Sequence, residues 1–313
     1  MTSKTDPNSA IAVVAPKKTS YRSLLQNPGG FRFMVGDVEI TALSDGTVSV
    51  DYHHVLTNVT PEKIDSVLSD LVRPSTCEAS ITAFLVKTGN RIILVDTGAG
   101  ELFGTKVCGN LLSALAANAI QPDKITDILI THVHSDHSGG LARGGQRLFT
   151  NAKIHIAKPD VDFFLNESNA AKTGYPANFF EEAIATVKPY QDAGQIQTFS
   201  GDTEVIPGIK AKIIGGHTPG STLFTLESKG EQIVFIGDII HFDAQLPRPE
   251  TTVIFDVHPD GALKNRAEYF KKWASEKTLL ASPHLNFPGV GHLKTNGAGY
   301  RWLPLYYTNR SFE

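Results

Sequence analysis

The stretch THVHSDHSGG, residues 131–140, constrains this chain more than any other part of its sequence. Within six positions it places three histidines and an aspartate: His132, His134, Asp136 and His137. The preceding run ITDILIT is typical of a β-strand, whose side chains alternate between two faces, so the first two histidines are expected on one side. The aspartate and the third histidine fall in the following turn, which can direct them toward the same cavity. Histidine and carboxylate groups gathered in this way predict a metal site.

Three more candidate ligands follow apolar strands elsewhere in the chain. His217 comes after KAKIIGG, Asp238 ends the run QIVFIGD, and His284 follows TLLASP. A carboxylate at the end of a buried strand needs a cation or hydrogen-bond donors, because burying it unpaired is costly. Ligand sites commonly form outside the carboxyl ends of sheet strands. Together the seven residues exceed the needs of one tetrahedral ion and predict two ions with one bridging carboxylate.

The full H-x-H-x-D-H pattern, with GHTPGS, IGD and SPHLNFPGVGH downstream, resembles the metallo-β-lactamase superfamily. The resemblance implies an α/β fold, the αβ/βα sandwich of two mixed β-sheets flanked by helices. It also implies how the ligands divide between the ions: His132, His134 and His217 on the first, Asp136, His137 and His284 on the second, and Asp238 bridging both.

Within that superfamily the chain is most similar to the methyl parathion hydrolase group, which includes dihydrocoumarin-hydrolysing lactonases. The matching stretches include VEITALSDGTV, VDTGAGELFG, ITHVHSDHSGGL and FPGVGHLKTNGAGYRWLPLYY, and they extend from about residue 31 to 308. We therefore expect a single hydrolase domain over residues 31–313. Residues 1–30, rich in Ser, Thr, Asn and Pro, are expected to form an irregular N-terminal arm. The group resemblance and the arm favour a homodimer.

The resemblance also indicates residues on the substrate side. His241 lies where quorum-quenching lactonases with the same seven ligands carry a tyrosine and methyl parathion hydrolase carries an apolar residue. A histidine there can hydrogen-bond a lactone oxygen or a leaving group, which favours a lactone over a phosphotriester; the alternative is a structural histidine. Phe103, Phe164 and Phe179 match aromatic wall positions of the group and predict a pocket for aryl groups. The candidate catalytic residues are Asp238, Asp136 and His241.

Other acidic residues and histidines near these motifs need separate interpretation. Asp96 ends the apolar strand RIILV and is expected to orient a ligand histidine. Asp45, in LSDGT, either does the same or only forms a turn. His292 is the alternative to His284 as the last ligand, and His284 is preferred because it directly follows the strand TLLAS.

The expected chemistry follows from the centre. We expect two divalent ions per chain, zinc first, with cobalt, manganese or iron as alternatives that the ligands also accept. A hydroxide bridging the ions would be the nucleophile, because coordination lowers the pKa of water to about 7. Aryl lactones and esters such as dihydrocoumarin are the expected substrates, with organophosphate triesters as a promiscuous activity. The alternatives are a primary methyl parathion-type phosphotriesterase, an acyl-homoserine lactonase, a thioesterase like glyoxalase II, and a degenerate metal-binding module; the last predicts lost ligands, but all seven are present.

Composition bears on partners and location. The formal charge of −3, without a run of basic residues, disfavours nucleic acid as a partner. The only cysteines, Cys77 and Cys108, lie far apart and have no metal-ligand spacing. No apolar run is long enough to cross a bilayer, so we expect no membrane partner. The expected location is the cytoplasm, or the periplasm if a leader has been removed.

Overall fold

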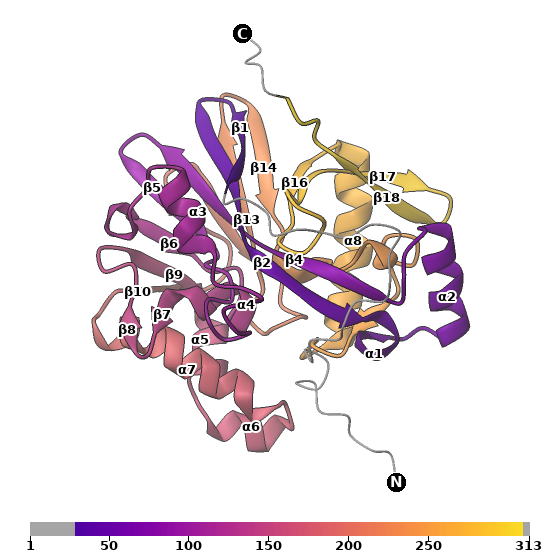
Figure 1. Ribbon diagram of the computed structural model, residues 1–313, viewed down its shortest axis with the longest axis horizontal. Coiled ribbons are helices and arrows are strands. Elements are labelled where there is room, and N and C mark those ends of the chain that lie inside the picture. Colours follow the sequence, from indigo (N-terminus) through magenta and orange to yellow (C-terminus); the bar gives the residue numbers. More distant parts are fainter. Residues whose placement is uncertain (1–28, 309–313) are drawn as a thin grey trace.

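Two β-sheets packed face to face form the centre of the molecule, with helices on the two outer faces (Figure 1). The computed structural model describes residues 29–308, so nearly all of the predicted arm at 1–30 lies outside the described residues. Each sheet has seven strands and each mixes parallel and antiparallel pairs. The predicted sandwich of two mixed sheets is therefore confirmed.

The first sheet has the strand order β1-β2-β4-β5-β6-β9-β10. Its pairs are antiparallel as far as β5 and parallel from β5 to β10. Its strands are β1 (Gly30–Val35), β2 (Val38–Asp51), β4 (Thr76–Thr88), β5 (Arg91–Val95), β6 (Asp127–Leu129), β9 (Lys153–Ala157) and β10 (Ile196–Phe199).

The second sheet has the order β11-β12-β13-β14-β16-β17-β18, and only β14 and β16 pair in parallel. Its strands are β11 (Thr203–Ile206), β12 (Ile209–Ile213), β13 (Thr222–Ser228), β14 (Glu231–Phe235), β16 (Leu279–Ala281), β17 (Val290–Asn296) and β18 (Gly299–Pro304). Two short two-stranded ribbons join β15 (Thr252–Val253) to β3 (Leu56–Thr57) and β7 (Ala142–Arg143) to β8 (Gln146–Arg147).

The helices are mostly connections between strands. They are α1 (Tyr52–Val55), α2 (Pro61–Asp70), α3 (Leu111–Ala117), α4 (Ser135–Ser138), α5 (Lys158–Phe164), α6 (Ser168–Thr173), α7 (Ala177–Asp192) and α8 (Pro259–Glu276). Short 3₁₀ turns lie at Pro122–Lys124, Gly139–Leu141, Gly237–Ile239 and Asp243–Gln245. No helix within residues 29–308 combines the length and the apolar composition that a membrane span requires.

Three apolar layers hold the sandwich together. Between the sheets, Phe84 of β4 meets Phe235 of β14 with ring centroids 5.4 Å apart, and both rings are buried. Outside the first sheet, Val187 and Tyr190 of α7 are buried against it, and outside the second sheet α8 packs its Trp273. Each fully buried aromatic side chain contributes about 1.5–3 kcal/mol, so these layers fix the distance between the sheets and hence between the loops at their ends.

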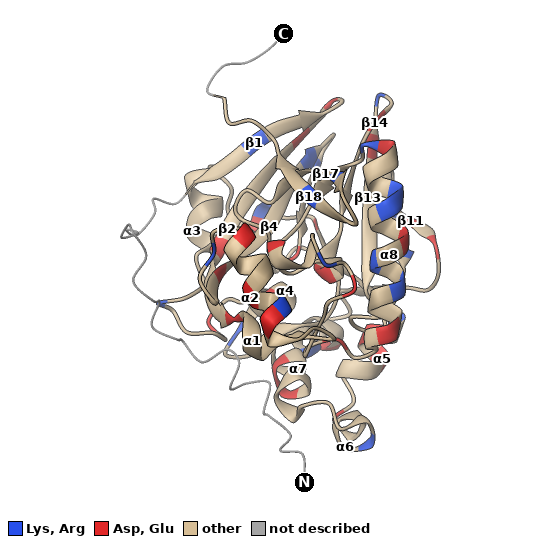
Figure 2. Ribbon diagram, turned by 90° about the vertical axis from the view of Figure 1, so that its right-hand side faces the viewer, with Lys and Arg blue, Asp and Glu red and all other residues tan. Residues whose placement is uncertain are grey.

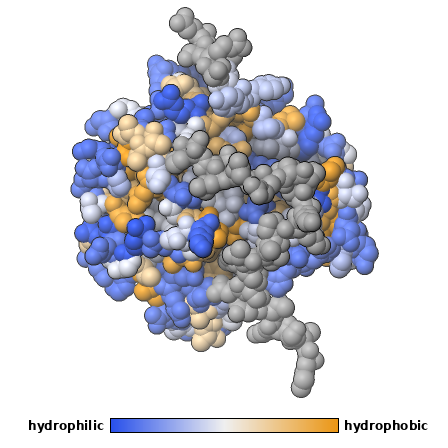
Figure 3. Space-filling view, in the orientation of Figure 1, coloured by the Kyte–Doolittle hydropathy of each residue, from blue (hydrophilic) through white to orange (hydrophobic). Residues whose placement is uncertain are grey.

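The surface mixes charge and polarity. Acidic and basic residues are interspersed along α8 in Figure 2. On the face shown in Figure 3, hydrophobic residues lie in several separate groups among hydrophilic ones.

Candidate metal centre

The H-x-H-x-D-H stretch lies in the loop and the single helical turn that follow β6. The strand ends at Leu129, two residues before the predicted run ends, so His132 and His134 lie on loop backbone rather than in the sheet. Their rings still face the same site, with His132 Nε2 3.1 Å from His134 Nδ1. His137 sits in α4, which turns it back toward the sheet end.

Three histidines form the first half of the centre. His217, from the loop between β12 and β13, brings its Nε2 to 3.0 Å from His134 Nδ1. His132, His134 and His217 are buried, and their ligand atoms form a group that could hold a metal ion.

The second half is built from the two sheets together. His284, after β16, has its Nε2 3.2 Å from His137 Nε2. Asp136 completes this group, with Oδ1 3.6 Å from His137 Nε2 and Oδ2 3.4 Å from His284 Nε2. Its side chain is 21% exposed, more than that of any other member, because it faces the cavity.

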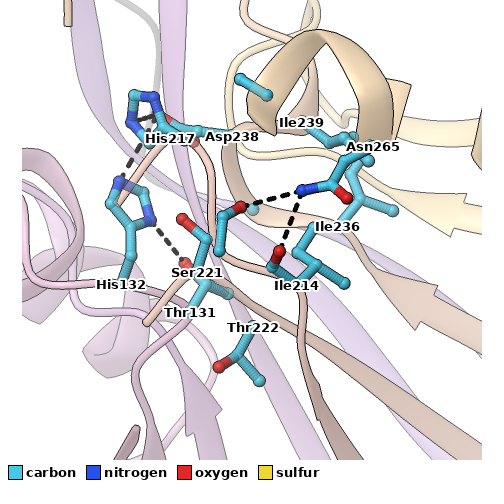
Figure 4. A pocket seen from close by; sticks show the side chains of 13 residues that line it. Thr131, His132, Ile214, His217, Ser221, Thr222, Ile236, Asp238, Ile239 and Asn265 are labelled. Carbon is cyan, nitrogen blue, oxygen red and sulfur yellow. Dashed lines mark hydrogen bonds and ion pairs between the residues drawn. The ribbon is translucent and has the colours of Figure 1, made fainter. Parts of the chain in front are cut away.

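Asp238 lies between the two halves. Its Oδ1 is 3.2 Å from His137 Nε2 and 3.1 Å from His284 Nε2. Its Oδ2 is 3.3 Å from His217 Nε2 and 3.6 Å from His132 Nε2. One carboxylate oxygen therefore faces each group. Figure 4 shows Asp238 beside His132 and His217 at one end of a small pocket, with Asn265 at the other end.

Each ligand histidine is held at the ring nitrogen that faces away from the centre. The partners are Thr131 Oγ1 for His132 (3.2 Å), the Tyr175 hydroxyl for His134 (2.9 Å), Asp256 Oδ1 for His217 (2.8 Å), Asp96 Oδ2 for His137 (2.9 Å) and Ser80 O for His284 (2.8 Å). These groups accept a hydrogen bond, so the outer nitrogen carries the proton and the inner nitrogen of a neutral ring is a lone pair.

The carboxylates of the centre favour positive charge on two of its histidines, His217 and His137. Although burial lowers it, hydrogen bonds and charge from Asp238 and Asp256 raise the pKa of His217 to about 9. Burial also lowers the pKa of His137, but nearby carboxylates outweigh this effect and raise the pKa well above its usual value. The surrounding histidines hold the pKa of Asp238 well below its usual value against the opposing effect of burial. A carboxylate kept ionised among lone pairs attracts protons or metal ions.

The spacing of the ligand atoms fits metal coordination. Zinc binds histidine nitrogen at about 2.0–2.1 Å in a tetrahedron, whose corners then lie about 3.4 Å apart. The distances between ligand atoms given above run from 3.0 to 3.6 Å. The residues present therefore fit divalent metal ions, and Asp238 contacts both groups of ligands. We call the seven residues the ligand cluster: His132, His134, Asp136, His137, His217, Asp238 and His284.

A cavity of about 550 Å³, including space open to solvent, leads to the ligand cluster. Apolar side chains make up half of its lining residues, and we call them the apolar wall: Val48, Val50, Ala79, Phe103, Phe179, Phe242 and Phe255. Among the described residues that line the cavity, none is a lysine or an arginine. The cavity can therefore accept a neutral, apolar group beside the cluster.

The three predicted wall phenylalanines do not all reach the cavity. Phe103 and Phe179 line it. Phe164 does not: its side chain is fully buried beneath His134, with ring centroids 5.5 Å apart. The expectation that Phe164 contacts substrate is therefore corrected, because α5 directs this side chain into the core and leaves it to support a ligand ring.

His241 also lines the cavity and differs from the ligand histidines. Its Nε2 lies 3.0 Å from Asp238 Oδ2, and its ring stacks on that of His284 at 8° with centroids 5.7 Å apart. Its Nδ1 has no hydrogen-bond partner among the described residues, although the side chain is buried, whereas its Nε2 lies against the Asp238 carboxylate. Burial lowers the pKa of His241, so the ring is neutral at neutral pH. It can therefore donate or accept toward a bound molecule.

Asp96 and Asp45 have different roles. Asp96 lies 2.9 Å from His137 and accepts the amide and hydroxyl of Thr131, in a left-handed backbone conformation with φ of 59°. Asp45 touches no ligand. At a bulge in β2 it accepts amides of Ala99 and Leu111, each at 2.9 Å, and so fixes the loop that carries Phe103.

His292 lies outside the ligand cluster. Its Nδ1 is 3.0 Å from the carbonyl oxygen of Thr278, whereas His284 lies within the second group.

Three residues near the centre were not identified from the sequence. Asp256 and Tyr175 hold His217 and His134. Asp160 accepts the amides of Val133 (2.9 Å) and Gly220 (2.5 Å), and thereby joins the two ligand loops of the first group. No local pattern marks these residues, because each acts through contacts between segments far apart in the chain.

Known proteins share this fold and these motifs. The model of the metallo-beta-lactamase superfamily matches residues 78–284. An N-acyl homoserine lactonase from Bacillus thuringiensis is 26% identical over 182 residues, which cover 52% of this chain and 65% of that relative, so less than two thirds of its length is matched.

Two solved structures are similar over nearly the whole chain. A hydrolase of the beta lactamase superfamily, AbOPH, superposes with a TM-score of 0.85 at 34% identity, covering 91% of this chain and 100% of that one. AidC, a dizinc quorum-quenching lactonase solved with the product N-hexanoyl-L-homoserine, gives 0.82 at 28% identity, covering 90% and 99%.

Proposed function

The chain belongs to the metallo-beta-lactamase superfamily, and we propose that it is a dinuclear metal-dependent hydrolase that opens aryl lactones and aryl esters such as dihydrocoumarin. The observation that carries the proposal is the position of Asp238, with one oxygen toward each group of ligands. We assign His132, His134 and His217 to the first ion. We assign Asp136, His137 and His284 to the second, with Asp238 shared.

Two divalent ions bound by these residues, with zinc the first choice and cobalt, manganese or iron as alternatives, would lower the pKa of water to about 7 and would polarise the oxygen under attack. The chain supplies the geometry. The outer hydrogen bonds keep each ligand ring in one orientation, so the ions need no rearrangement during the reaction. Asp136, at the edge of the cavity, accepts a proton from the attacking water and returns it to the leaving oxygen.

The cavity supports a neutral, aromatic substrate. Phe103, Phe179 and Phe255 offer flat apolar surfaces within reach of the ligand cluster. An anionic substrate such as a thioester of an acidic carrier would find no lysine or arginine among the described lining residues. An aryl lactone also has a phenol leaving group, whose pKa of about 10 makes it leave easily without a strong acid.

His241 supports a lactone over a phosphotriester. A buried imidazole nitrogen without a partner, such as His241 Nδ1, loses hydrogen-bonding energy unless a bound molecule provides one. We assign the His241 ring to a hydrogen bond with the lactone carbonyl or the leaving oxygen. Organophosphate triesters, also neutral, would be slower substrates of the same site.

The second candidate is an acyl-homoserine lactonase. The similarity to the Bacillus thuringiensis lactonase and to AidC favours it. Its substrate is also a neutral lactone, but its leaving group is an alkoxide, which is poorer than a phenoxide.

A kinetic panel tests these assignments. One metal-loaded sample would be assayed with dihydrocoumarin, an acyl-homoserine lactone and methyl paraoxon, and its metal content measured. We expect two ions per chain and the highest kcat/KM for dihydrocoumarin. A higher kcat/KM for the homoserine lactone or for methyl paraoxon would favour that alternative, and a folded protein without bound metal would overturn the dinuclear centre.

A further inference from the structure

We propose that Tyr175 is a positioning residue whose single hydroxyl fixes two of the three histidines of the first ion, His134 and His217. The inference rests on the proposed dinuclear centre. It concerns a residue in the loop between α6 and α7, far in sequence from every ligand motif.

His134 needs a separate hydrogen-bond partner because it presents Nδ1, not Nε2, to the centre. His132 and His217 direct Nε2 to the centre, whereas His134 directs Nδ1, the atom 3.1 and 3.0 Å from those two nitrogens. A neutral imidazole offers a lone pair at Nδ1 only when the proton is on Nε2. The ring alone does not favour that arrangement strongly enough to exclude the other.

The Tyr175 hydroxyl makes the choice. It donates its proton to the carbonyl oxygen of Phe255 at 2.8 Å. Its oxygen can then only accept at the 2.9 Å contact with His134 Nε2, which requires the proton of His134 to be there. Nδ1 is left as a lone pair directed at the first ion.

The same hydroxyl reaches His217 through the backbone. Phe255 precedes Asp256, whose Oδ1 lies 2.8 Å from His217 Nδ1. By holding the Phe255 carbonyl, Tyr175 holds the segment from which Asp256 orients that ligand. Two ligands on different loops thus depend on one oxygen atom.

The second ion has separate supports. The outer nitrogens of His137 and His284 are held by Asp96 and by the carbonyl oxygen of Ser80. Loss of the Tyr175 hydroxyl should therefore weaken one ion and leave the other. The ring itself is held by packing against Phe179, with centroids 5.0 Å apart, so a phenylalanine would keep its place.

The experiment compares Tyr175→Phe with a matched control, Tyr190→Phe. Tyr190 is fully buried, and its hydroxyl also bridges two groups: it accepts the amide of Phe149 at 3.0 Å and donates to the carbonyl of Leu141 at 2.9 Å. Both variants lose a bridging hydroxyl, but only Tyr175, which is partly buried, touches a ligand. Zinc release from each zinc-loaded protein would be titrated with a chromogenic chelator, and thermal unfolding followed alongside.

For Tyr175→Phe we expect one of the two ions to bind about 10–100-fold more weakly and the other to be unchanged, because outer partners of ligand histidines have effects of that size. Tyr190→Phe should unfold at a lower temperature and keep both affinities. If Tyr175→Phe holds both ions as tightly as the wild type, or loses both equally, the positioning role is overturned. Wild-type protein that binds no zinc would instead overturn the dinuclear centre, and this proposal with it.

Discussion

The ligand cluster and the apolar wall lie side by side in one site but are constrained very differently. Every histidine of the ligand cluster is bonded at its outer nitrogen, so each ring has one orientation. The apolar wall offers van der Waals surface, and Nδ1 of His241 beside it has no hydrogen-bond partner within the described structure. The hydrogen bonds around the ligand cluster therefore fix the positions of the ligand atoms. The apolar wall and His241 are less constrained, so small changes there can alter which substrate binds.

The largest expected effect on activity comes from Asp238→Ala, which removes the carboxylate shared by the two groups of the ligand cluster. Lewis-acid activation by the ions is worth several kcal/mol, and about 4 kcal/mol corresponds to about 1000-fold in rate. We therefore expect kcat/KM for every substrate to fall by at least about 1000-fold, with fewer than two ions per chain by elemental analysis.

A carboxylate outside the cluster provides the control for Asp238→Ala. Asp243, on the same loop, is bonded to Tyr52 at 3.0 Å and to Arg73 at 3.1 Å. Asp243→Ala should lower stability and keep both ions. Unchanged turnover in Asp238→Ala would contradict the bridging role.

The next largest effect is expected for His241→Leu, which changes the substrate side of the site and leaves the ligand cluster intact. His241 is not a member of the ligand cluster, so its removal should leave the metal content unchanged. A hydrogen bond of about 1.4 kcal/mol corresponds to a tenfold change, so kcat/KM for dihydrocoumarin should fall about tenfold, whereas methyl paraoxon should lose less.

Phe179→Leu is the matched change in the apolar wall for His241→Leu, since it alters packing but no hydrogen bond. It should affect both substrates alike. An equal fall for both substrates in His241→Leu would show that the histidine only fills space.

The same contrast explains how much of the site the sequence predicted. The ligand cluster was predictable because four of its members fall within six residues and the others follow apolar strands, whose ends the fold brings together. The mixed sandwich was predicted on the same basis, with the strand before His132 ending two residues early.

The surroundings of the cluster were less predictable because they depend on rotations and loop contacts. Phe163 and Phe164 are neighbours on α5, yet only the second is fully buried, since adjacent helical side chains point about 100° apart. Asp45 was assigned a turn or a ligand contact, and a bulge turned it toward Leu111 instead. The contact of Tyr175 with His134 spans 41 residues and leaves no local signal.

The smallest effect on catalysis is expected at a histidine–carboxylate pair that lies outside the ligand cluster and does not line the cavity. Asp127 of β6 lies 3.0 Å from His155 Nε2, a pair like Asp256 and His217, and also binds Arg91 at 2.7 Å. Burial alone would raise the pKa of Asp127, but hydrogen bonds from His155, Thr126 and Arg91 lower it to about 2. Asp127→Asn should therefore cost about 2 kcal/mol of the free energy of unfolding at pH 7, and leave metal content and kcat/KM unchanged.

The stability lost in Asp127→Asn should be larger at neutral pH than at acidic pH. The folded-state pKa of Asp127 lies below the ordinary value of 3.8, so the ionised carboxylate stabilises the fold fully above about pH 4, and this contribution disappears as the pH falls toward 2. Urea unfolding of both proteins at about pH 7 and about pH 3 should show a large difference at the first and a smaller one at the second. An equal difference at both values would mean that shape rather than charge is responsible. A loss of metal in Asp127→Asn would mean that histidine–carboxylate pairs outside the ligand cluster also support metal binding. The residues that support the metal centre would then include the Asp127–His155 pair of β6 and β9.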